Sequence, residues 1–373
     1  MRIVFWAASG IVFYSYLGYA LWLWVWSRLS PKPVLRGANE PVVSIIMVVR
    51  NEEGALPRKL SNLGRLNYPP ERLEFVVVSD GSSDRTVEIL LEAAKDERFH
   101  ILVSREPEGK ACRLNEALAV AKGEIAVFMD ARQEIERDAL RLLLENFADS
   151  TVGCVSGELM LGDAASGEAE KRMGIYWRME KKIRALESAS GSVVGATGAL
   201  YAARCSLLVP IPAETILDDV LLPLHVLRQG ARVVFDGRAR AWDDPDLGAE
   251  KEFRRKVRTL TGNYQLLRIA PWVLSPTNPI RFRFVSHKLL RLAVPFALAA
   301  LLVASAAISE PLYRAAFALQ LAFYALSLFA LAKQPRGPLA RVANAALALI
   351  VLNTAAVVAF ANFVTGRKQV WIR

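Results

Sequence analysis

Residues 42–53 read VVSIIMVVRNEE, an unbroken apolar run followed at once by polar and charged residues. An apolar run of this length is typical of a strand that is buried on both faces of a parallel sheet. Two further runs have the same character, EFVVVS at 74–79 and EIAVFM at 124–129. The three runs predict the central strands of an α/β domain.

Helical patterns alternate with these strands. They cover residues 52–66, 84–96, 110–122 and 136–148. Alternation of strands and helices implies a Rossmann-like, mostly parallel sheet with right-handed crossovers. Ligands of such sheets bind outside the carboxyl ends of the strands. We therefore expect one α/β domain over residues 37–280, with its site at that edge of the sheet.

Polar residues follow the end of each predicted strand, as RNEE at 50–53, SDGSSD at 79–84 and DAR at 130–132. Parallel strands end at one edge of a sheet, so these segments meet where a nucleotide and a divalent cation would bind. Several other sites are excluded by missing motifs. No G-x-G-x-x-G follows the first strand, Gly109-Lys110 lacks the rest of a P-loop, and neither H-E-x-x-H nor G-x-S-x-G occurs.

The charge is unevenly distributed along the chain. The net charge is +10, but residues 37–280 alone sum to −4. Residues 281–373 hold eleven Lys and Arg against Glu310 alone. A nucleic-acid-binding protein needs a basic patch on its folded domain, so nucleic acid is excluded as a partner. The pattern fits a membrane protein with cationic flanks at the cytoplasmic face.

Four uncharged stretches are long enough to cross a bilayer as helices. They cover residues 3–26, 292–309, 315–332 and 342–366. Because about 20 apolar residues span a bilayer, we expect one N-terminal anchor within 1–36 and about three transmembrane helices within 292–373. The first stretch is too long and too aromatic at its end for a cleaved signal peptide. Basic and apolar residues interleave at 281–291, which predicts an interfacial segment on membrane lipids.

The basic flanks predict the orientation. Arg28, Lys32 and Arg36 mark the cytoplasmic side of the first span, so the 37–280 domain is expected in the cytoplasm, at the inner membrane. Three further full spans would then place the basic tail at 367–373 outside, against the same rule. Either the tail breaks the rule, or one C-terminal segment lies in the interface or re-enters. The sequence leaves both alternatives open.

Six motifs occur in the order found in family 2 glycosyltransferases. They are VVRNEE at 48–53, SDGSSD at 79–84, Gly109-Lys110 with Asn115, Gly123-Glu124 leading to FMD at 128–130, GATGALY at 195–201 and LDD at 217–219. The chain more closely resembles the membrane-bound branch that includes cellulose, hyaluronan and chitin-oligosaccharide synthases. The resemblance implies a GT-A fold and an inverting transferase with a nucleotide-sugar donor, expected to be UDP-linked, and Mg²⁺ or Mn²⁺.

The resemblance also implies donor-binding roles for residues at the strand ends. The implied donor residues are Arg50, Asn51, Glu52, Asp80, Lys110, Asp130, Arg132 and Arg258. Asp80 would contact the base or ribose, and Lys110 would face the diphosphate. Asp130 would bind the metal through the diphosphate, which needs charge neutralisation as it leaves.

The resemblance implies that Asp219 is the general base, with Asp218 beside it. A sugar hydroxyl is a poor nucleophile and needs a carboxylate within hydrogen-bond reach. Gly195, Gly198 and Tyr201 would form the floor of the acceptor site. The acceptor would be a growing glycan or a lipid-linked molecule, with membrane lipids and an export or synthesis-complex protein as further partners.

Two departures from the family pattern affect these expectations. The family's Asp-x-Asp is Asp130-Ala-Arg132 here, so Arg132 would replace part of the cation charge, or a carboxylate within 243–246 would supply a ligand. The Gln-x-x-Arg-Trp of processive enzymes is RKVRT at 255–259, which keeps Arg258 but has no aromatic residue. Tyr264 and Trp272 are candidate replacements, and polymer elongation and single transfer both stay open.

Simpler roles compete with several of these assignments. Asp80 could belong to a turn, and Asp84 fits a helix N-cap better than a catalytic role. Asp218 and Asp219 could simply open a helix, where acids suit the dipole. The amphipathic pattern at 167–188 favours packing against the domain over a lipid contact. The alternative function is a non-catalytic membrane scaffold that binds a nucleotide sugar within a polysaccharide synthesis complex.

Overall fold

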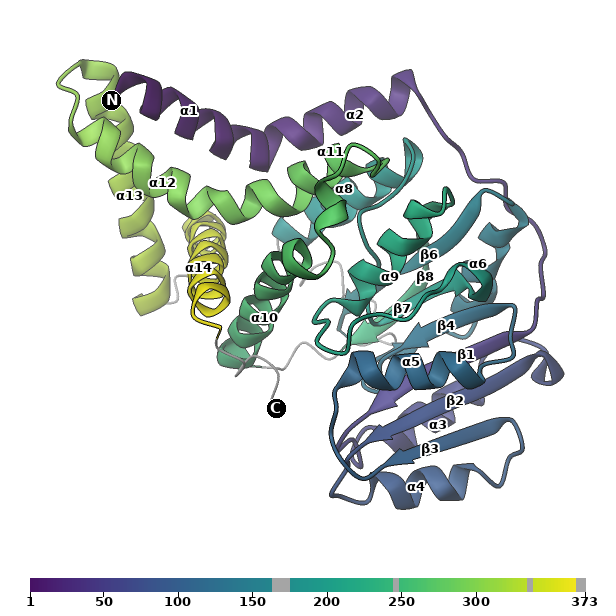
Figure 1. Ribbon diagram of the computed structural model, residues 1–373. Helices are drawn as coiled ribbons and strands as arrows, with labels where there is room; N and C mark the ends of the chain where they lie inside the picture. The colour runs from purple at the N-terminus through teal and green to yellow at the C-terminus, as the bar shows by residue number, and fades with distance from the viewer. Residues whose placement is uncertain (163–174, 244–247, 334–337, 367–373) are drawn as a thin grey trace.

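The structure is a computed structural model that describes residues 1–162, 175–243, 248–333 and 338–366 (Figure 1). In this described part, an 8-stranded sheet has the order β3-β2-β1-β4-β7-β6-β8-β5. The strands are β1 (Val43–Val49), β2 (Leu73–Asp80), β3 (Phe99–Ser104), β4 (Ile125–Met129), β5 (Glu134–Ile135), β6 (Val152–Leu161), β7 (Leu200–Arg204) and β8 (Arg232–Asp243).

The predicted α/β sheet is confirmed, and it is mixed. The three apolar runs form β1, β2 and β4, and β1 pairs in parallel with both of the others. The sequence did not reveal β3, β6, β7 and β8. β7 runs antiparallel to β4 and β6, whereas β6 and β8 are parallel. Among the described strands, β7 and the short β5 therefore run opposite to the others, and the reversal of β7 places the loop before it beside the ends of the parallel strands.

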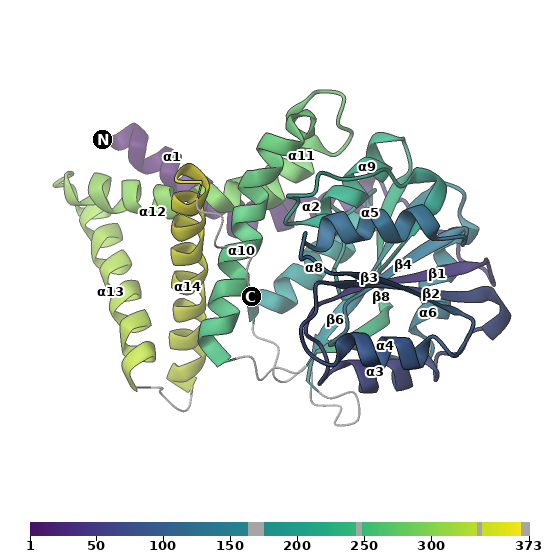
Figure 2. The ribbon, with the colours of Figure 1, turned by 60° about the horizontal axis from the view of Figure 1, so that its bottom comes forward.

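Helices cover both faces of the sheet. Figure 2 shows α3 (Leu56–Leu63), α4 (Thr86–Ala93) and α6 (Ala139–Leu144) on one face, with α5 (Lys110–Val120) and α9 (Asp218–Arg228) on the other. The first core includes Leu56 and Leu143, and the second includes Leu114 and Leu222; all four are fully buried or nearly so. The N-termini of α5 and α9 are thereby fixed at the edge of the sheet where β4 ends.

Four helical segments are long and apolar enough to cross a membrane, which confirms the predicted arrangement of one N-terminal and three C-terminal segments. The first consists of α1 (Arg2–Phe13), the π-helical turn η1 (Tyr14–Gly18) and α2 (Tyr19–Leu29), and the second of α11 (Arg281–Phe284), the π-helical turn η6 (Val285–Leu289) and α12 (Leu290–Ala306). The third and fourth are α13 (Pro311–Lys333) and α14 (Pro338–Val364).

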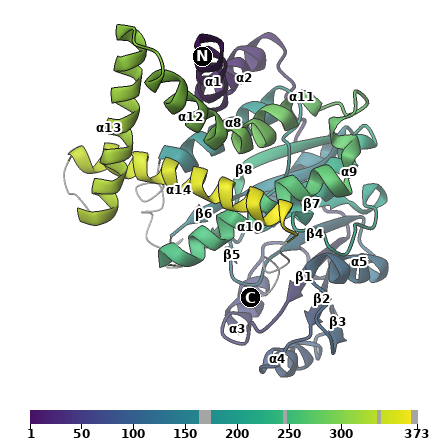
Figure 3. The same cartoon turned by 60° about the vertical axis from the view of Figure 1, so that its left-hand side comes forward.

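The four segments do not form a parallel bundle. Figure 1 shows α14 nearly end-on while α1 and α12 lie across the view, and Figure 3 shows α14 along α10 (Gly248–Ile269) of the α/β domain. Membrane spans tilt by about 20° on average. The four segments are thus not aligned with one another, and both alternatives for the C-terminal segments stay predictions.

The predicted interfacial segment 281–291 is helical and continues into α12. Its inner side is docked onto the protein, because the buried Arg283 guanidinium donates hydrogen bonds to backbone carbonyl oxygens of Glu187, Ser190 and Ser192. Phe282 is 50% exposed, and Arg281 is exposed as well. Contact with lipid is therefore a prediction for this outer side alone.

The amphipathic pattern at 167–188 corresponds to α8 (Ile175–Ala189), and residues 167–174 lie outside the described part. The buried face of α8 contacts the N-terminal membrane helix, where Ile183 packs with Tyr19 and Leu23. The Tyr19 hydroxyl donates a hydrogen bond to the buried carboxylate of Glu187 at 2.5 Å. α8 thus joins the α/β domain to its membrane segments.

Candidate active site

Charged side chains gather where β4 ends and where α5 and α9 begin. The Nζ atom of Lys110 lies 3.0 Å from Asp130 Oδ1 and 3.3 Å from Asp218 Oδ2. A Cβ atom at Gly198 would lie 3.5 Å from Asp219 Oδ2, 3.6 Å from Asp130 Oδ2 and 3.9 Å from Lys110 Nζ. The structure therefore brings together five of the residues predicted from the sequence.

The two carboxylates at the start of α9 lie in different environments. Asp218 is buried and paired with Lys110, whereas Asp219 is half-buried and accepts a hydrogen bond from the Gly198 backbone N–H at 3.2 Å. Burial, followed by the negative charge of Asp218, raises the pKa of Asp219 to about 6. A carboxylate with a pKa near the working pH is suited to act as a general base. The geometry thus favours Asp219 over Asp218 for proton transfer.

Lys110 stays charged in this cluster. Burial by itself lowers the pKa of an ammonium group, but the carboxylates of Asp130 and Asp218 outweigh it and raise the pKa of Lys110 above its usual range. Lys110 is therefore a permanent cation between the end of β4 and the start of α9.

The segment 195–201 forms the floor of this cluster. A Cβ atom at Gly195 would lie 3.0 Å from Val220 Cγ2, so the missing side chain allows α9 to approach closely. The expected acceptor contact of Tyr201 is corrected by the structure, because Tyr201 is fully buried and its ring stacks on Phe128 with centroids 4.4 Å apart. Tyr201 supports the site from below, and Gly198 is the residue of this motif that adjoins the carboxylates.

Asp80 is the last residue of β2 and holds the loop before α5. Its Oδ1 accepts hydrogen bonds from Glu108 N at 2.8 Å and Arg113 Nε at 3.0 Å, and its Oδ2 accepts one from Gly109 N at 3.0 Å. Asp80 therefore has a structural role in this loop, and its contact with a donor stays a prediction. Arg113 was not predicted; its signal in the sequence is the spacing of three from Lys110, which places both on one side of α5.

The residues after β1 are linked to those after β2. Asn51 has a positive φ of 52°, and its Oδ1 accepts a hydrogen bond from Ser83 N at 2.8 Å. Glu52 forms an ion pair with Arg132 at 2.9 Å, whereas Arg50 is exposed. The carboxylate of Glu52 therefore already opposes the charge that Arg132 was expected to offer to a diphosphate.

Asp84 has the predicted helix-start role. Its Oδ1 accepts a hydrogen bond from Thr86 N at 3.0 Å, and its Oδ2 accepts one from Glu53 N at 3.2 Å, at the beginning of α4. Its two oxygens thus organise the backbone around the edge of the sheet.

Arg258 of α10 is exposed and lies outside the lining of the cavity described below, so its donor contact stays a prediction. Arg255 lines that cavity and pairs with the buried Asp243 at 3.5 Å. Tyr264 stacks on Phe363 of α14, and Trp272 lies against Arg228 of α9. Neither candidate aromatic lines the cavity. Of the carboxylates considered as metal ligands, Asp243 is thus paired with Arg255, and those at 244 and 246 lie outside the described part.

A cavity of about 300 Å³ extends from Asp219 to the membrane helices. Its residues from the α/β domain include Trp177, Glu180, Arg184, Glu187, Gly195, Thr197, Asp219, Glu252, Arg255, Lys256 and Asn263. Its residues from the membrane segments are Tyr16, His287, Lys288, Arg291, Leu352, Asn353 and Ala356. Sequence reasoning could not assemble this wall, because its parts lie as far apart in the sequence as Tyr16 and Ala356. The cavity gives a polar route between the carboxylate of Asp219 and the membrane.

The carboxylates beside Lys110 fit a divalent cation. Carboxylate oxygens are the ligands that Mg²⁺ and Mn²⁺ prefer. Asp130, Asp218 and Asp219 together outnumber the one lysine between them, and the buried Asp218 Oδ2 forms no hydrogen bond within the described residues. Asp130 is the most open of the group, with a side chain 41% exposed. It is therefore the residue that can hold a cation together with the phosphates of a bound nucleotide.

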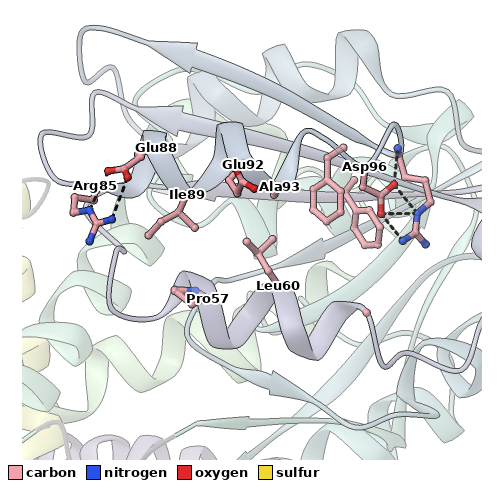
Figure 4. Close-up of a pocket in the computed structure, with 12 residues that line it drawn as sticks. Pro57, Leu60, Arg85, Glu88, Ile89, Glu92, Ala93 and Asp96 are labelled. Atoms are coloured by element: carbon pink, nitrogen blue, oxygen red, sulfur yellow. Dashed lines mark hydrogen bonds and ion pairs between the residues drawn. The ribbon is translucent and has the colours of Figure 1, made fainter.

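A larger groove of about 680 Å³ lies between α3 and α4, away from these carboxylates. Figure 4 shows Pro57 and Leu60 facing Ile89 across it. Its charged residues pair with one another, Arg85 with Glu88 at 2.9 Å and Arg98 with Asp96 at 2.6 Å. The groove therefore has apolar walls and no reactive cluster.

Comparison with known proteins identifies the domain. Residues 44–208 match the sequence profile of Glycosyl transferase family 2. This segment therefore contains a family 2 glycosyltransferase domain. The chain is 23% identical over 270 residues to the poly-beta-1,6-N-acetyl-D-glucosamine synthase of Staphylococcus aureus, which covers 71% of this chain and 63% of that protein. It is 27% identical over 243 residues to the probable glycosyltransferase YdaM of Bacillus subtilis, covering 60% and 55%. The match thus spans about six tenths of the length of these curated relatives.

A solved structure shares the fold of this chain. It is described as the mannosyltransferase PcManGT from Pyrobaculum calidifontis in complex with GDP-Man and Mn²⁺. The two structures superpose with a TM-score of 0.75 and 23% identity, over 98% of this chain and 99% of the other. The likeness includes the membrane segments and confirms the expected GT-A fold class.

Proposed function

We propose that the protein is a membrane-bound inverting glycosyltransferase that moves a sugar from a nucleotide-sugar donor to a glycan or lipid-linked acceptor. One observation carries the proposal: Asp219 lies between the Lys110–Asp130 pair and a cavity that reaches the membrane helices. A donor diphosphate at Lys110 and an acceptor in the cavity would meet at this carboxylate. The family 2 match of residues 44–208 supports the same reaction class.

The donor would bind along the ends of β1, β2 and β4. Arg50, Asn51, Glu52 and Asp80 are the residues assigned to its nucleoside. The charge of Lys110 would face the diphosphate, and a divalent cation at Asp130, Mg²⁺ or Mn²⁺, would supply the remaining neutralisation. A UDP-linked sugar is the first donor to test, and GDP-mannose is the second because the structural neighbour was solved with it.

The proposed step is a single displacement. The acceptor hydroxyl gives its proton to the carboxylate of Asp219, and its oxygen bonds to the anomeric carbon. The bond from that carbon to the diphosphate breaks at the same time, and the diphosphate oxygen keeps the electron pair. Because attack comes from the face opposite the leaving group, the anomeric configuration inverts.

The charge distribution supports a cytoplasmic position for the α/β domain, where nucleotide sugars are made. The basic residues at 28–36 flank the N-terminal segment on the side of that domain. The exposed side of 281–291 would then lie along the inner leaflet, with membrane lipids as neighbours. An export or synthesis-complex protein is the remaining proposed partner.

The test is a nucleotide-release screen of the purified full chain with UDP- and GDP-linked sugars, with and without Mn²⁺, in the presence of a membrane lipid extract. We expect metal-dependent release with one class of donor and a labelled product in the lipid or polymer fraction. Asp219→Asn gives the background, and Glu214→Gln is the matched control, because Glu214 is an exposed acid in the loop before α9. Donor binding with no transfer by the wild type would instead favour the scaffold function.

A further inference from the structure

The cavity beside Asp219 carries more positive charge than its own acids balance. Three of its four carboxylates have basic partners: Glu180 pairs with Arg291 at 2.6 Å, Glu187 with His287 at 2.9 Å, and Glu252 with Lys256. The fourth is Asp219, whose Oδ2 accepts a backbone hydrogen bond. Each acid of the cavity thus has a partner within the protein, although Glu187 Oε2 forms no hydrogen bond among the described residues.

Lys288 and Arg184 line the same cavity. Neither of these cations has an acid within ion-pair distance among the described residues. Lys288 belongs to η6 and is half-buried. Arg184 of α8 donates hydrogen bonds to Ser156 Oγ at 2.5 Å and Gly195 O at 3.5 Å, both of which are neutral. Removing a cation from water without a counter-charge costs several kcal/mol, and an anionic ligand offsets this cost.

The side of the cavity that is formed by membrane segments is polar at one level and apolar beyond it. The Asn353 amide donates a hydrogen bond to the Tyr16 hydroxyl at 2.9 Å, while Leu352 and Ala356 line the cavity beside it. Opposite them, Asn263 of α10 is 4% exposed, and its Oδ1 has no hydrogen-bond partner in the described part of the chain. A buried acceptor oxygen of this kind requires a donor such as a sugar hydroxyl or water.

We propose that this cavity binds the phosphate of a lipid acceptor, with Lys288 and Arg184 holding the anionic group and the lipid chain leaving between η1 and α14. The inference rests on the proposed function and narrows its acceptor to a phosphate-bearing lipid. The reacting hydroxyl would then lie at Asp219, and the Asn263 carbonyl would accept from a neighbouring hydroxyl. A neutral glycan chain would leave both cations without a counter-charge.

The test is direct binding, measured without any sugar nucleotide, by native mass spectrometry of the full chain in neutral detergent. Farnesyl phosphate is the probe, and farnesol and inorganic phosphate are the comparison ligands. We expect farnesyl phosphate to bind at least about tenfold more tightly than either, because a charge-assisted hydrogen bond and apolar burial act together. Lys288→Met, which keeps an apolar stem, should weaken farnesyl phosphate binding about tenfold.

Arg281→Ala is the matched control, because Arg281 is an exposed cation of the same helical segment and lies outside the cavity lining. The control should bind farnesyl phosphate like the wild type. Lys288→Gln, by contrast, should lose affinity as Lys288→Met does. Melting temperatures are recorded for all variants. Equal binding of farnesol and farnesyl phosphate, or full affinity in a folded Lys288→Met variant, would overturn the proposal.

The donor diphosphate is the other possible source of an anion at Lys288, and a second titration separates the two. UDP and GDP should bind Lys288→Met as they bind the wild type. If nucleotide binding falls in this variant while farnesyl phosphate binding does not, Lys288 serves the donor and the lipid-phosphate proposal is wrong. The proposed transferase function would survive that result, since it depends on the nucleotide-release screen.

Discussion

Replacement of Asp219 by Asn tests the assignment of the general base through activity and stability together. Burial and the charge of Asp218 raise the pKa of Asp219 from 3.8 to about 6. A folded-state pKa above the unfolded value favours folding at low pH, and this contribution is lost as pH rises through about 6. The difference corresponds to at most about 3 kcal/mol of destabilisation above pH 6, at about 1.4 kcal/mol per pKa unit.

Asp219→Asn removes the buried charge and keeps an oxygen that can accept the hydrogen bond from Gly198 N–H. We therefore expect the variant to melt several degrees higher than the wild type at pH 8, and to gain less at pH 5, where the wild-type carboxylate is largely protonated. Its turnover should fall by about 10²-fold or more, as is usual for loss of a positioned general base. Donor affinity should change little.

The assays are thermal unfolding of the detergent-solubilised chain at both pH values and a pH profile of kcat/KM. For the wild type, kcat/KM should fall about tenfold for each pH unit below about 6, because the protonated carboxylate cannot accept a proton. A variant that is active but melts below the wild type would refute the reasoning, since it would show that Asp219 mainly caps the start of α9.

Three further predictions follow from the same site. Excess chelator should abolish transfer, and Asp130→Ala should weaken nucleotide binding only when Mn²⁺ is present; full activity in chelator would leave Lys110 as the sole neutralising group. Gly198→Ala should fold normally, because its Cβ would make ordinary contacts of 3.5 and 3.6 Å with the Asp219 and Asp130 carboxylates, yet turnover should fall at least about tenfold as the substrate is displaced. In intact cells, single-cysteine reporters at the exposed Ala38 and Arg281 should be shielded from an impermeant thiol reagent and one at Ser309 labelled; the reverse pattern would contradict the proposed orientation.

Three strands of the parallel half of the sheet were readable from the sequence, whereas β3 and the strands of the mixed half were not. β1, β2 and β4 are buried on both faces, so each appears as a continuous apolar run. β6 is also buried, but it contains Ser156 and Glu158, whose polarity hides the strand. Glu158 is neutralised by Lys181 of α8 at 2.7 Å, a contact that no local pattern predicts.

The candidate site, like the sheet, could be predicted from the sequence only in part. Lys110, Asp130 and Asp219 each follow or precede a regular element at a position where parallel strands converge, so the chemistry could be placed at one edge of the sheet. Arg258 was assigned by motif spacing alone. It lies outside the cavity lining while Arg255 and Thr259 of the same helix line it, and its role stays a prediction because spacing alone does not fix how α10 packs against α14.

The membrane segments contribute to the site through two irregular turns. π-helical turns are rare and often occur at functional positions. η1 and η6 lie in different segments and meet directly, since the Tyr14 hydroxyl and Ser286 Oγ form a hydrogen bond at 2.9 Å. Each turn also supplies a residue to the cavity, Tyr16 from η1 and Lys288 from η6. A regular α-helix through either turn would place one residue fewer in that turn and rotate the following side chains. The two irregular turns therefore set which polar groups reach the cavity, and the membrane segments form part of its wall.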